Sequence, residues 1–316
     1  MSDLPSVAAE AVSFLKAGAR DGQHLHIVAD DATAEELTAF LQDVLPDQRV
    51  SWFPAWDILP FDPMLPALEV MGQRMAILGR CAAGKREVII VALPTLLQKL
   101  PPVGATPNFA ICIGQSLDVD ELGRFMRSAG YVEDDRVDLP GEVAFHGSTI
   151  EIFAAGDKLP CRIEMDGETV KSLRCYDPVT QQSCGTIEQL DIAPISELPE
   201  EMSIAYSGMA TLFDHLGDSR ATALKSTLDR VETEFKQLAR MHRDAEKDGL
   251  APPPLAERFI DQAEWSALQG RVEEWPVPEW TPVPAFARDP RPRRAFANWL
   301  SEWDGRTVLV ASSPRE

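Results

Sequence analysis

Apolar residues in the first hundred positions follow two different spacings. Residues 31–45 (DATAEELTAFLQDVL) place apolar side chains at steps of three and four, which predicts an amphipathic helix with Asp31 as its N-cap. Short apolar runs at 24–29 and 86–92 predict strands. The second run is rich in β-branched residues, as is typical of a central parallel strand that is buried on both faces. This alternation of helix and strand predicts a parallel α/β domain over residues 1–107.

Individual residues in this first part carry more local predictions. Pro66 suits the first turn of a helix that ends at Gly84, and Thr95 is expected to cap the short helix that follows the second strand. His24 and His26 are two positions apart on the first strand. We therefore expect one exposed and one packed imidazole here rather than a pair of metal ligands.

Near residue 108 the pattern changes to short alternating segments. A strand (NFAICIG) is followed by a helix for which Ser116 is the expected N-cap. Three segments with period-two alternation come next: TIEIF, CRIEM and TVKSLRCYD. The dipeptide Asp166-Gly167 between the last two is typical of a two-residue hairpin turn. We interpret residues 108–197 as an inserted α+β domain.

The remaining residues are predicted to be mostly helical. Residues 218–249 carry one apolar stripe, which predicts a long amphipathic helix, and we interpret 198–270 as a helical return that completes the first domain. Proline and tryptophan are frequent in a connector at 271–292, and 293–316 is interpreted as the start of a further α/β unit. Trp265, Trp275 and Trp280 either anchor the connector to the core, which is the favoured interpretation, or form a binding platform.

The charge of the chain argues against nucleic acid as a direct partner. The formal net charge is -20, and residues 108–197 hold 17 Asp and Glu against 7 Lys and Arg. A protein that grips DNA unaided needs a surface of Lys and Arg that displaces counterions from the phosphates. We therefore expect no direct DNA binding by this chain.

The composition also bears on compartment and redox state. The sequence has no apolar run of the ~20 residues that span a bilayer and no basic segment ahead of an apolar N-terminal block, so we expect a cytoplasmic protein without membrane contact. The five cysteines are scattered without a C-x-x-C pair, which favours free thiols over a zinc site or a disulfide framework.

Residue patterns that support catalysis are missing at the positions where they would be needed. A phosphate-binding loop requires G-x-x-x-x-G-K-[ST] after a strand, but Gly84-Lys85 is followed by Arg86 and preceded by a predicted helix. The carboxylates at 118–121 and 133–135 are better explained as solvated charges in a first helical turn and a loop. We expect no catalytic, cofactor-binding or metal-binding residues, and hence no enzyme.

The order of several segments resembles that of one known family. The segments are FPAWDILPFDPMLPALEVMGQRMAIL at 53–78, REVIIVALPTLLQKL at 86–100, the stretch from DLPGEV to PVTQQS at 138–183, and IAPISELP at 192–199. This succession resembles the N-terminal UvrB-homology module of the bacterial transcription-repair coupling factor, Mfd. The resemblance runs from about residue 10 to 216 and continues more thinly to the end.

The resemblance implies a fold and explains the missing loop. It implies a UvrB-like, degenerate P-loop-type parallel α/β domain that is interrupted by an inserted α+β domain and completed by a helical return. In that family the module is a motor that has lost its nucleotide site. The working motor lies downstream, beyond a segment that binds RNA polymerase, and we expect neither in this chain. Either the chain is a fragment of a longer Mfd, which we favour, or it is a free-standing short relative.

The resemblance also implies a partner and its contact residues. In the family the inserted domain docks the damage-recognition protein UvrA through two arginines and an aromatic residue. These positions correspond here to His146, Arg162 and Asp166. Only Arg162 keeps the family's residue, and Asp166 puts a carboxylate where the family has a ring, so any UvrA binding is expected to be weak. The alternative is a diverged relative with a structural or regulatory role that keeps the fold and has lost UvrA binding.

Overall fold

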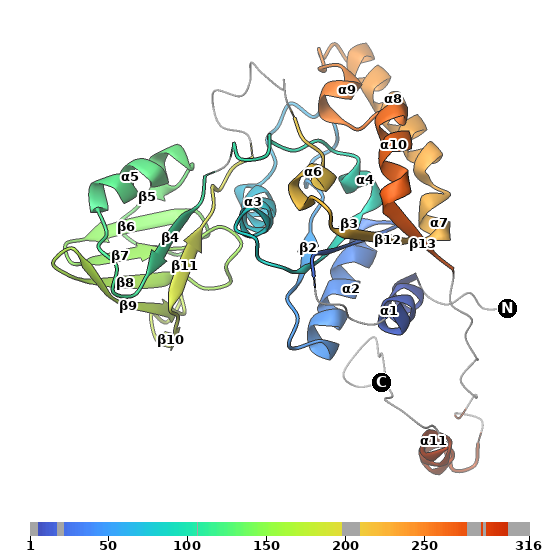
Figure 1. Cartoon of the computed structure of the whole chain (residues 1–316), viewed down its shortest axis with the longest axis horizontal. Coiled ribbons are helices and arrows are strands. Elements are labelled where there is room, and N and C mark those ends of the chain that lie inside the picture. Colours follow the sequence, from blue (N-terminus) through green and yellow to red (C-terminus); the bar gives the residue numbers. More distant parts are fainter. Residues whose placement is uncertain are drawn as a thin grey trace.

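The computed structural model describes residues 6–17, 22–105, 107–197, 209–276, 286 and 289–302. Two sheets of different character lie side by side, each with its own helices (Figure 1). The expected α/β class is therefore confirmed, with one sheet all parallel and the other almost wholly antiparallel. No helix within the described ranges is long and apolar enough to cross a membrane.

The first sheet has five parallel strands in the order β13-β12-β1-β3-β2. Its strands are β1 (His24–Val28), β2 (Val50–Phe53), β3 (Val88–Ala92), β12 (Arg220–Leu224) and β13 (Val272–Trp275). β3 lies between β1 and β2, and all five of its residues are buried, which confirms the prediction of a central strand. The connection from β3 to β12 contains the whole of the inserted domain.

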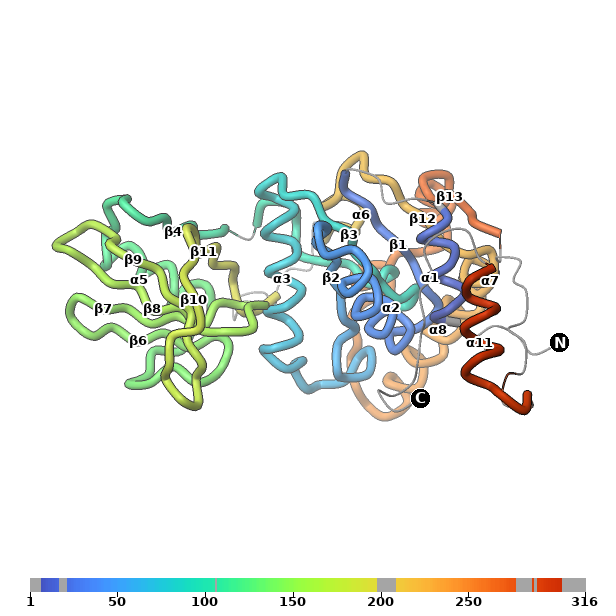
Figure 2. The backbone as a smooth tube through the Cα atoms, turned by 90° about the horizontal axis from the view of Figure 1, so that it is seen from below, coloured from blue at the N-terminus to red at the C-terminus, as the bar shows by residue number. Residues whose placement is uncertain are grey.

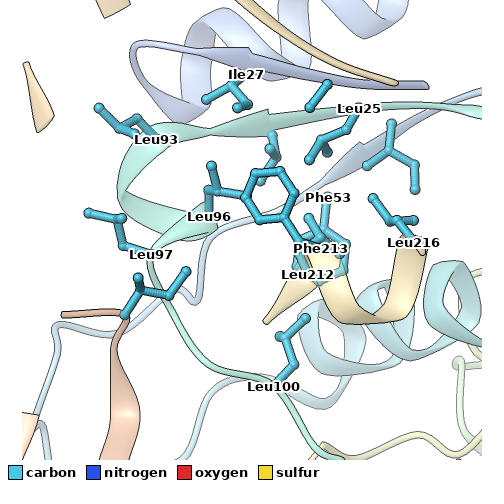
Figure 3. Close-up of a cluster of buried hydrophobic side chains, with 14 of the residues drawn as sticks. Leu25, Ile27, Phe53, Leu93, Leu96, Leu97, Leu100, Leu212, Phe213 and Leu216 are labelled. Atoms are coloured by element: carbon cyan, nitrogen blue, oxygen red, sulfur yellow. The ribbon is translucent and has the colours of Figure 1, made fainter. Parts of the chain in front are cut away.

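Helices cover both faces of this sheet. On one face lie α1 (Ser6–Ala17) and α2 (Asp31–Val44), which enclose a core with Val28 and Ile90. The other face is covered by α3 (Leu68–Ala82), α4 (Leu93–Leu96), α6 (Leu212–Leu216), α8 (Val231–Lys247), α9 (Leu255–Arg258) and α10 (Gln262–Leu268). Phe53 and Phe213 meet in the middle of this second core, among leucines from α4 and α6 (Figure 3).

Several local predictions for the first domain were wrong. The predicted helix at 218–249 contains strand β12, then α7 (Lys225–Leu228) and then α8, and the predicted connector begins with strand β13. β12 has the sequence RATAL, and four of its five residues are buried, so its place beside β1 outweighs the helix propensity of alanine.

Two of the expected tryptophan anchors are confirmed, because Trp265 and Trp275 are buried, whereas Trp280 lies outside the described residues.

Three helix starts also differ from the prediction. The N-cap of α2 is Asp30, whose carboxylate accepts a hydrogen bond from the amide of Thr33, and Asp31 is the first helical residue. Helix α4 begins directly after β3, so Thr95 lies inside it, and α3 starts at Leu68, two residues after Pro66. Gly84 follows the end of α3 with a φ of 71°, as expected for a residue that terminates a helix.

The two histidines of β1 are both buried, which corrects the expectation that one is exposed. Both imidazoles contact the hydroxyl of Thr222 at 2.8 Å, and Nε2 of His26 lies 3.0 Å from a carboxylate oxygen of Glu10. The face that was expected to be open is covered by α1 and by the ring of Trp275. These hydrogen bonds satisfy the two imidazoles within the core.

The inserted domain is built on a six-stranded sheet in the order β10-β9-β8-β7-β6-β5. Its strands are β5 (Val132–Glu133), β6 (Glu142–His146), β7 (Thr149–Ile152), β8 (Cys161–Asp166), β9 (Thr169–Tyr176) and β10 (Ser183–Thr186). A separate pair, β4 (Phe109–Cys112) and β11 (Gln189–Ile192), joins the domain to the rest of the chain. Helix α5 (Val119–Ser128) is capped by Asp118 rather than by Ser116, because the Asp118 carboxylate accepts from two backbone amides of the first turn.

Helix α3 connects the two domains through its small residues. Figure 2 shows α3 between the inserted domain and the parallel sheet. A Cβ atom on Gly72 would lie 2.6 Å from Cδ1 of Ile195, and one on Gly79 would lie 2.5 Å from the Asn108 side chain. The absent side chains therefore allow the close approach of the inserted domain. At the other end of the chain α11 (Pro292–Ser301) lies in the segment predicted to start a further α/β unit, and the rest of that segment, after residue 302, lies outside the described residues.

Candidate functional site

One face of the six-stranded sheet is packed against helix α5. The other is open around the end of β8, whereas Ala144, Glu151 and Tyr176 on the same side are buried. Side chains from β7, β8 and β9 pack with Leu122 and Met126 of α5 on the inner face. Along β8 the alternation of buried and more exposed residues directs Arg162, Glu164 and Asp166 to the opposite side. We call this side the outer face.

Strand pairing places the three expected docking residues on this outer face. Arg162 of β8 pairs with Glu151 of β7, in the middle of the sheet. His146 and Asp166 end strands β6 and β8, and both are exposed. The turn that follows β6 lies against the end of β8, because the amide of Met165 in β8 donates to the carbonyl of Ser148 at 2.8 Å. The structure therefore brings His146 and Asp166 to one edge of the face, with Arg162 further along β8.

Arg162 has several intramolecular partners. Its Nε donates to Oε1 of Glu151 at 2.7 Å, and Nη2 donates to Oε1 of Gln181 at 3.2 Å. The guanidinium carbon also lies 4.6 Å from the centroid of the Tyr176 ring. The side chain keeps 29% of its surface exposed, so its position is fixed from below while one side remains open to a partner.

Glu151 and Tyr176 form a buried support beneath Arg162. The Tyr176 hydroxyl donates to the second carboxylate oxygen of Glu151 at 2.8 Å. Burial raises the pKa of Tyr176 above its ordinary value, and the neighbouring Glu151 carboxylate raises it further. Gln181 approaches from a loop in which its own φ is 60°, an unusual value for a residue other than glycine. The guanidinium is therefore oriented by three side chains from different segments.

The edge of the face that holds Asp166 is acidic. Glu164 accepts a hydrogen bond from Ser172 at 2.7 Å, and this bond together with nearby Arg174 lowers the pKa of Glu164. Asp166 pairs with Thr169 across the hairpin, so the two turn residues are Gly167 and Glu168 rather than the predicted Asp166 and Gly167. A partner that covers this edge meets carboxylates unless it carries basic groups of its own.

Sequence reasoning missed most of the support beneath Arg162. The sequence offers two counter-ions for Arg162 on its own sheet, Glu164 or Glu151, and the structure pairs Arg162 with Glu151. Tyr176 and Gln181 were not predicted: Tyr176 is the last residue of β9, and Gln181 reaches Arg162 from the connection between β9 and β10. Period-two alternation in TVKSLRCYD is the signal that could have placed Arg174 on the outer face beside Arg162.

The short connection between β1 and α2 in the first domain carries acidic residues. Only Ala29 and Asp30 connect β1 to α2. Asp31 accepts hydrogen bonds from Nε1 of Trp52 at 3.0 Å and from the amide of Ala55 at 3.1 Å. These carboxylates thus lie at the helix N-terminus, where a nucleotide-binding domain receives phosphate.

Comparison with known proteins finds a matching family and several named relatives of this chain. Residues 109–198 match the family described as the UvrB interaction domain, and this range begins with β4 and ends just past β11. The transcription-repair-coupling factor of Haemophilus influenzae is 28% identical over 202 residues, which is 63% of this chain and 17% of that protein. The resemblance to this family is confirmed.

Two further relatives have the same name. The transcription-repair-coupling factor of Escherichia coli is 31% identical over 157 residues, or 49% of this chain and 14% of that protein. The factor of Myxococcus xanthus is 27% identical over 227 residues, or 70% of this chain and 18% of that protein. The chain therefore spans less than a fifth of the length of these coupling factors.

Proposed function

We propose that the chain is a non-catalytic protein-docking module of transcription-coupled nucleotide-excision repair, and that its inserted domain recruits UvrA. The observation that carries this proposal is the match of residues 109–198 to the UvrB interaction domain, together with the exposed outer face of the sheet in the same segment. Relatives named as transcription-repair-coupling factors over more than half of the chain support the pathway.

Arg162 is the proposed centre of the contact. Glu151, Gln181 and Tyr176 hold its guanidinium in place, which lowers the entropy that a partner would otherwise have to remove on binding. A partner carboxylate that approaches the open side would meet a planar set of N–H donors suited to paired hydrogen bonds. His146 can add one hydrogen bond at the edge, whereas Asp166 weakens the contact with any acidic partner.

The first domain acts as a rigid support in this proposal. In this proposal residues 108–197 are the docking unit, and the supporting domain comprises the first 107 residues together with the return of the chain through β13. The close packing of α3 against the insert through Gly72 and Gly79 supports a fixed orientation of the outer face. The Lys85–Asp191 ion pair joins the same two domains.

The proposal is tested by binding of the purified chain to the cognate UvrA. Arg162→Ala should weaken the complex strongly, because truncation of one side of a desolvated charge pair costs roughly 2–5 kcal/mol. Arg162→Lys should also weaken it, because an ammonium keeps the charge but loses the planar fork. Arg127→Ala is the matched control, since Arg127 is an exposed arginine on α5, the helix that packs on the inner face.

Thermal melting of each variant shows whether a loss of UvrA binding is caused by unfolding of the variant. Arg162→Ala leaves the Glu151 carboxylate without its cation, so the variant is scored only at temperatures where its melting curve shows it folded. Equal binding by wild type, Arg162→Ala and Arg127→Ala would place the contact elsewhere. A folded wild type that fails to bind UvrA at all would instead support a relative that has lost the contact.

A further inference from the structure

A second candidate site lies in the first domain, away from the outer face. A cavity of about 380 Å³ is enclosed between residues 55–66, helix α4, and Leu238, Arg258 and Phe259 of the helical return. Residues 55–66 follow strand β2, and α4 follows strand β3 directly. The cavity is therefore at the carboxyl ends of two parallel strands, which is the edge where open α/β sheets bind their ligands.

The wall of this cavity is aromatic. Trp56, Phe61 and Phe259 all contribute to it, and the Phe61 and Phe259 rings meet edge to face with centroids 5.8 Å apart. Leu59, Met64 and Leu65 extend the apolar surface to solvent, with 66%, 69% and 68% of their surfaces exposed. An opening of this kind suits a flat apolar molecule better than a sugar or a nucleotide.

A buried hydroxyl in the wall has no hydrogen-bond partner in the part of the chain that the structure describes. Thr95 is only 5% exposed and is one of the residues that line the cavity. Buried hydroxyl groups are normally paired, so a solitary one that borders a cavity points to a polar atom supplied by a ligand. Thr38 is equally buried, yet its hydroxyl donates to the carbonyl of Ala34 at 2.8 Å.

A cation borders the same space. The guanidinium carbon of Arg258 lies 6.0 Å from the centroid of Trp56, and both residues line the cavity. The acidic residue of the wall, Asp62, already accepts a hydrogen bond from the amide of Met64 at 2.9 Å. The polar groups of the wall are the hydroxyl of Thr95, the guanidinium of Arg258, the carboxylate of Asp62 and the side-chain amide of Gln98. Of these, the hydroxyl and the guanidinium together suit a carboxylate.

The loop over the cavity is held in an unusual conformation. Phe61 has a φ of 69°, in the left-handed region that bulky side chains rarely adopt. The centroid of its ring lies 5.1 Å from that of His242 and 5.8 Å from that of Phe259. Packing of the ring against these two residues therefore maintains the backbone conformation. Strained residues of this kind cluster at ligand sites.

We propose that this cavity binds a small aromatic carboxylate. The ring lies between Trp56, Phe61 and Phe259, and the carboxylate accepts a hydrogen bond from Thr95 and pairs with Arg258. This site is independent of the outer face of the inserted domain, and it does not rest on the function proposed there.

The probe for this site is 1-naphthoate, titrated into the full chain by calorimetry, with the neutral 1-naphthalenemethanol as its uncharged counterpart. Wild type should bind 1-naphthoate saturably at one site. Thr95→Val keeps the shape of the side chain and should weaken binding about fivefold, as expected for one hydrogen bond. Arg258→Met should lower the affinity for 1-naphthoate by about tenfold or more and leave the affinity for 1-naphthalenemethanol nearly unchanged.

Thr38→Val is the matched control for the hydroxyl. In the absence of ligand, Thr95→Val should raise the melting temperature, because it removes an unpaired buried hydroxyl, whereas Thr38→Val should lower it by breaking a hydrogen bond. Only Thr95→Val should change the affinity for 1-naphthoate. Failure of folded wild type to bind 1-naphthoate saturably, or equal affinity in the two valine variants, would overturn the proposal.

Discussion

Arg74 and Glu197 form an ion pair that is closed off from solvent. Nε of Arg74 lies 2.5 Å from Oε1 of Glu197, and the two side chains are 0% and 1% exposed. Trp56 donates its indole N–H to the same carboxylate oxygen, and Arg74 also donates to the carbonyl of Pro54 at 2.9 Å. Because Arg74 belongs to α3 and Glu197 follows the last strand of the insert, this pair ties the two domains together.

Loss of either partner of this pair should be strongly destabilising. Glu197→Gln leaves a buried guanidinium without its counter-charge, so we expect the free energy of unfolding to fall by about 3–5 kcal/mol. Urea denaturation followed by circular dichroism measures this change. The exposed pair of Lys225 and Asp229 is the control, and Asp229→Asn should change stability by no more than about 1 kcal/mol. Similar small losses in both variants would show that the Arg74–Glu197 pair is hydrated.

The register of the β8–β9 hairpin shows where sequence reasoning reached its limit. A two-residue turn was predicted at Asp166-Gly167, and the hairpin exists, but its turn begins one residue later. An irregularity between Glu164 and Met165 then shifts the pairing once more, so that Arg162 faces Arg174. Side-chain pattern predicts that two strands pair, but turn type and bulges decide which residues face each other.

The core of the first domain was predictable only where its strands are strongly apolar. The run VIIVA predicts β3 directly, because a central strand buried on both faces is continuously hydrophobic. β12 is also buried but contains alanine and threonine, which lie beside the larger Leu25, His26 and Ile27 of β1. No local signal separates that strand from the start of a helix. The three candidate docking residues were placed by resemblance, and the structure adds the partners that orient Arg162.

Asp157 should make the stability of the domain junction depend on pH. The residue is exposed at the mouth of the cleft between the two domains, where partial desolvation raises the pKa of its carboxyl group to about 6, against the opposing effects of Arg80 and Arg49. The folded state therefore binds a proton more tightly than the unfolded chain does. Stability from this group is fully present below about pH 4 and is lost as the pH rises through about 6.

Asp157→Asn isolates this effect. The variant should melt at a higher temperature than wild type at pH 8, and the difference should shrink towards pH 4. Asp244 provides a contrast of opposite sign, because its hydrogen bond to Lys247 lowers the pKa of its carboxyl group. Asp244→Asn should lose stability at neutral pH and approach wild type at low pH. If the difference in melting temperature between Asp157→Asn and wild type does not change with pH, the titration of Asp157 does not affect the stability of the junction.

The chain should not bind ATP. The amide of Thr33 at the start of α2 is already bonded to Asp30, and Asp31 is held nearby by Trp52 and Ala55. A triphosphate placed there would meet two carboxylates at short range instead of a lysine and free amides. Calorimetric titration with ATP and magnesium should therefore give no saturable heat. Micromolar affinity accompanied by phosphate release would contradict this interpretation.

Restoring an aromatic ring at the edge of the outer face should strengthen UvrA binding. Asp166 is exposed at the end of β8, next to the turn that follows His146, and it adds to the charge of Glu164. Asp166→Phe removes this charge and supplies a ring that a partner can cover. Burial of a phenylalanine side chain contributes about 1.5–3 kcal/mol, so the affinity for UvrA should rise by about tenfold or more.

Two further variants separate the causes of this gain. Asp166→Asn removes only the charge, so its effect on affinity measures the electrostatic part, and the remainder belongs to the ring. The double variant Arg162→Ala/Asp166→Phe distinguishes specific docking from adhesion of an exposed phenylalanine. Specific docking requires Arg162, and the double variant should then bind UvrA far more weakly than Asp166→Phe alone. If the double variant keeps the full gain, the ring acts by non-specific adhesion, and the outer face is not the docking surface.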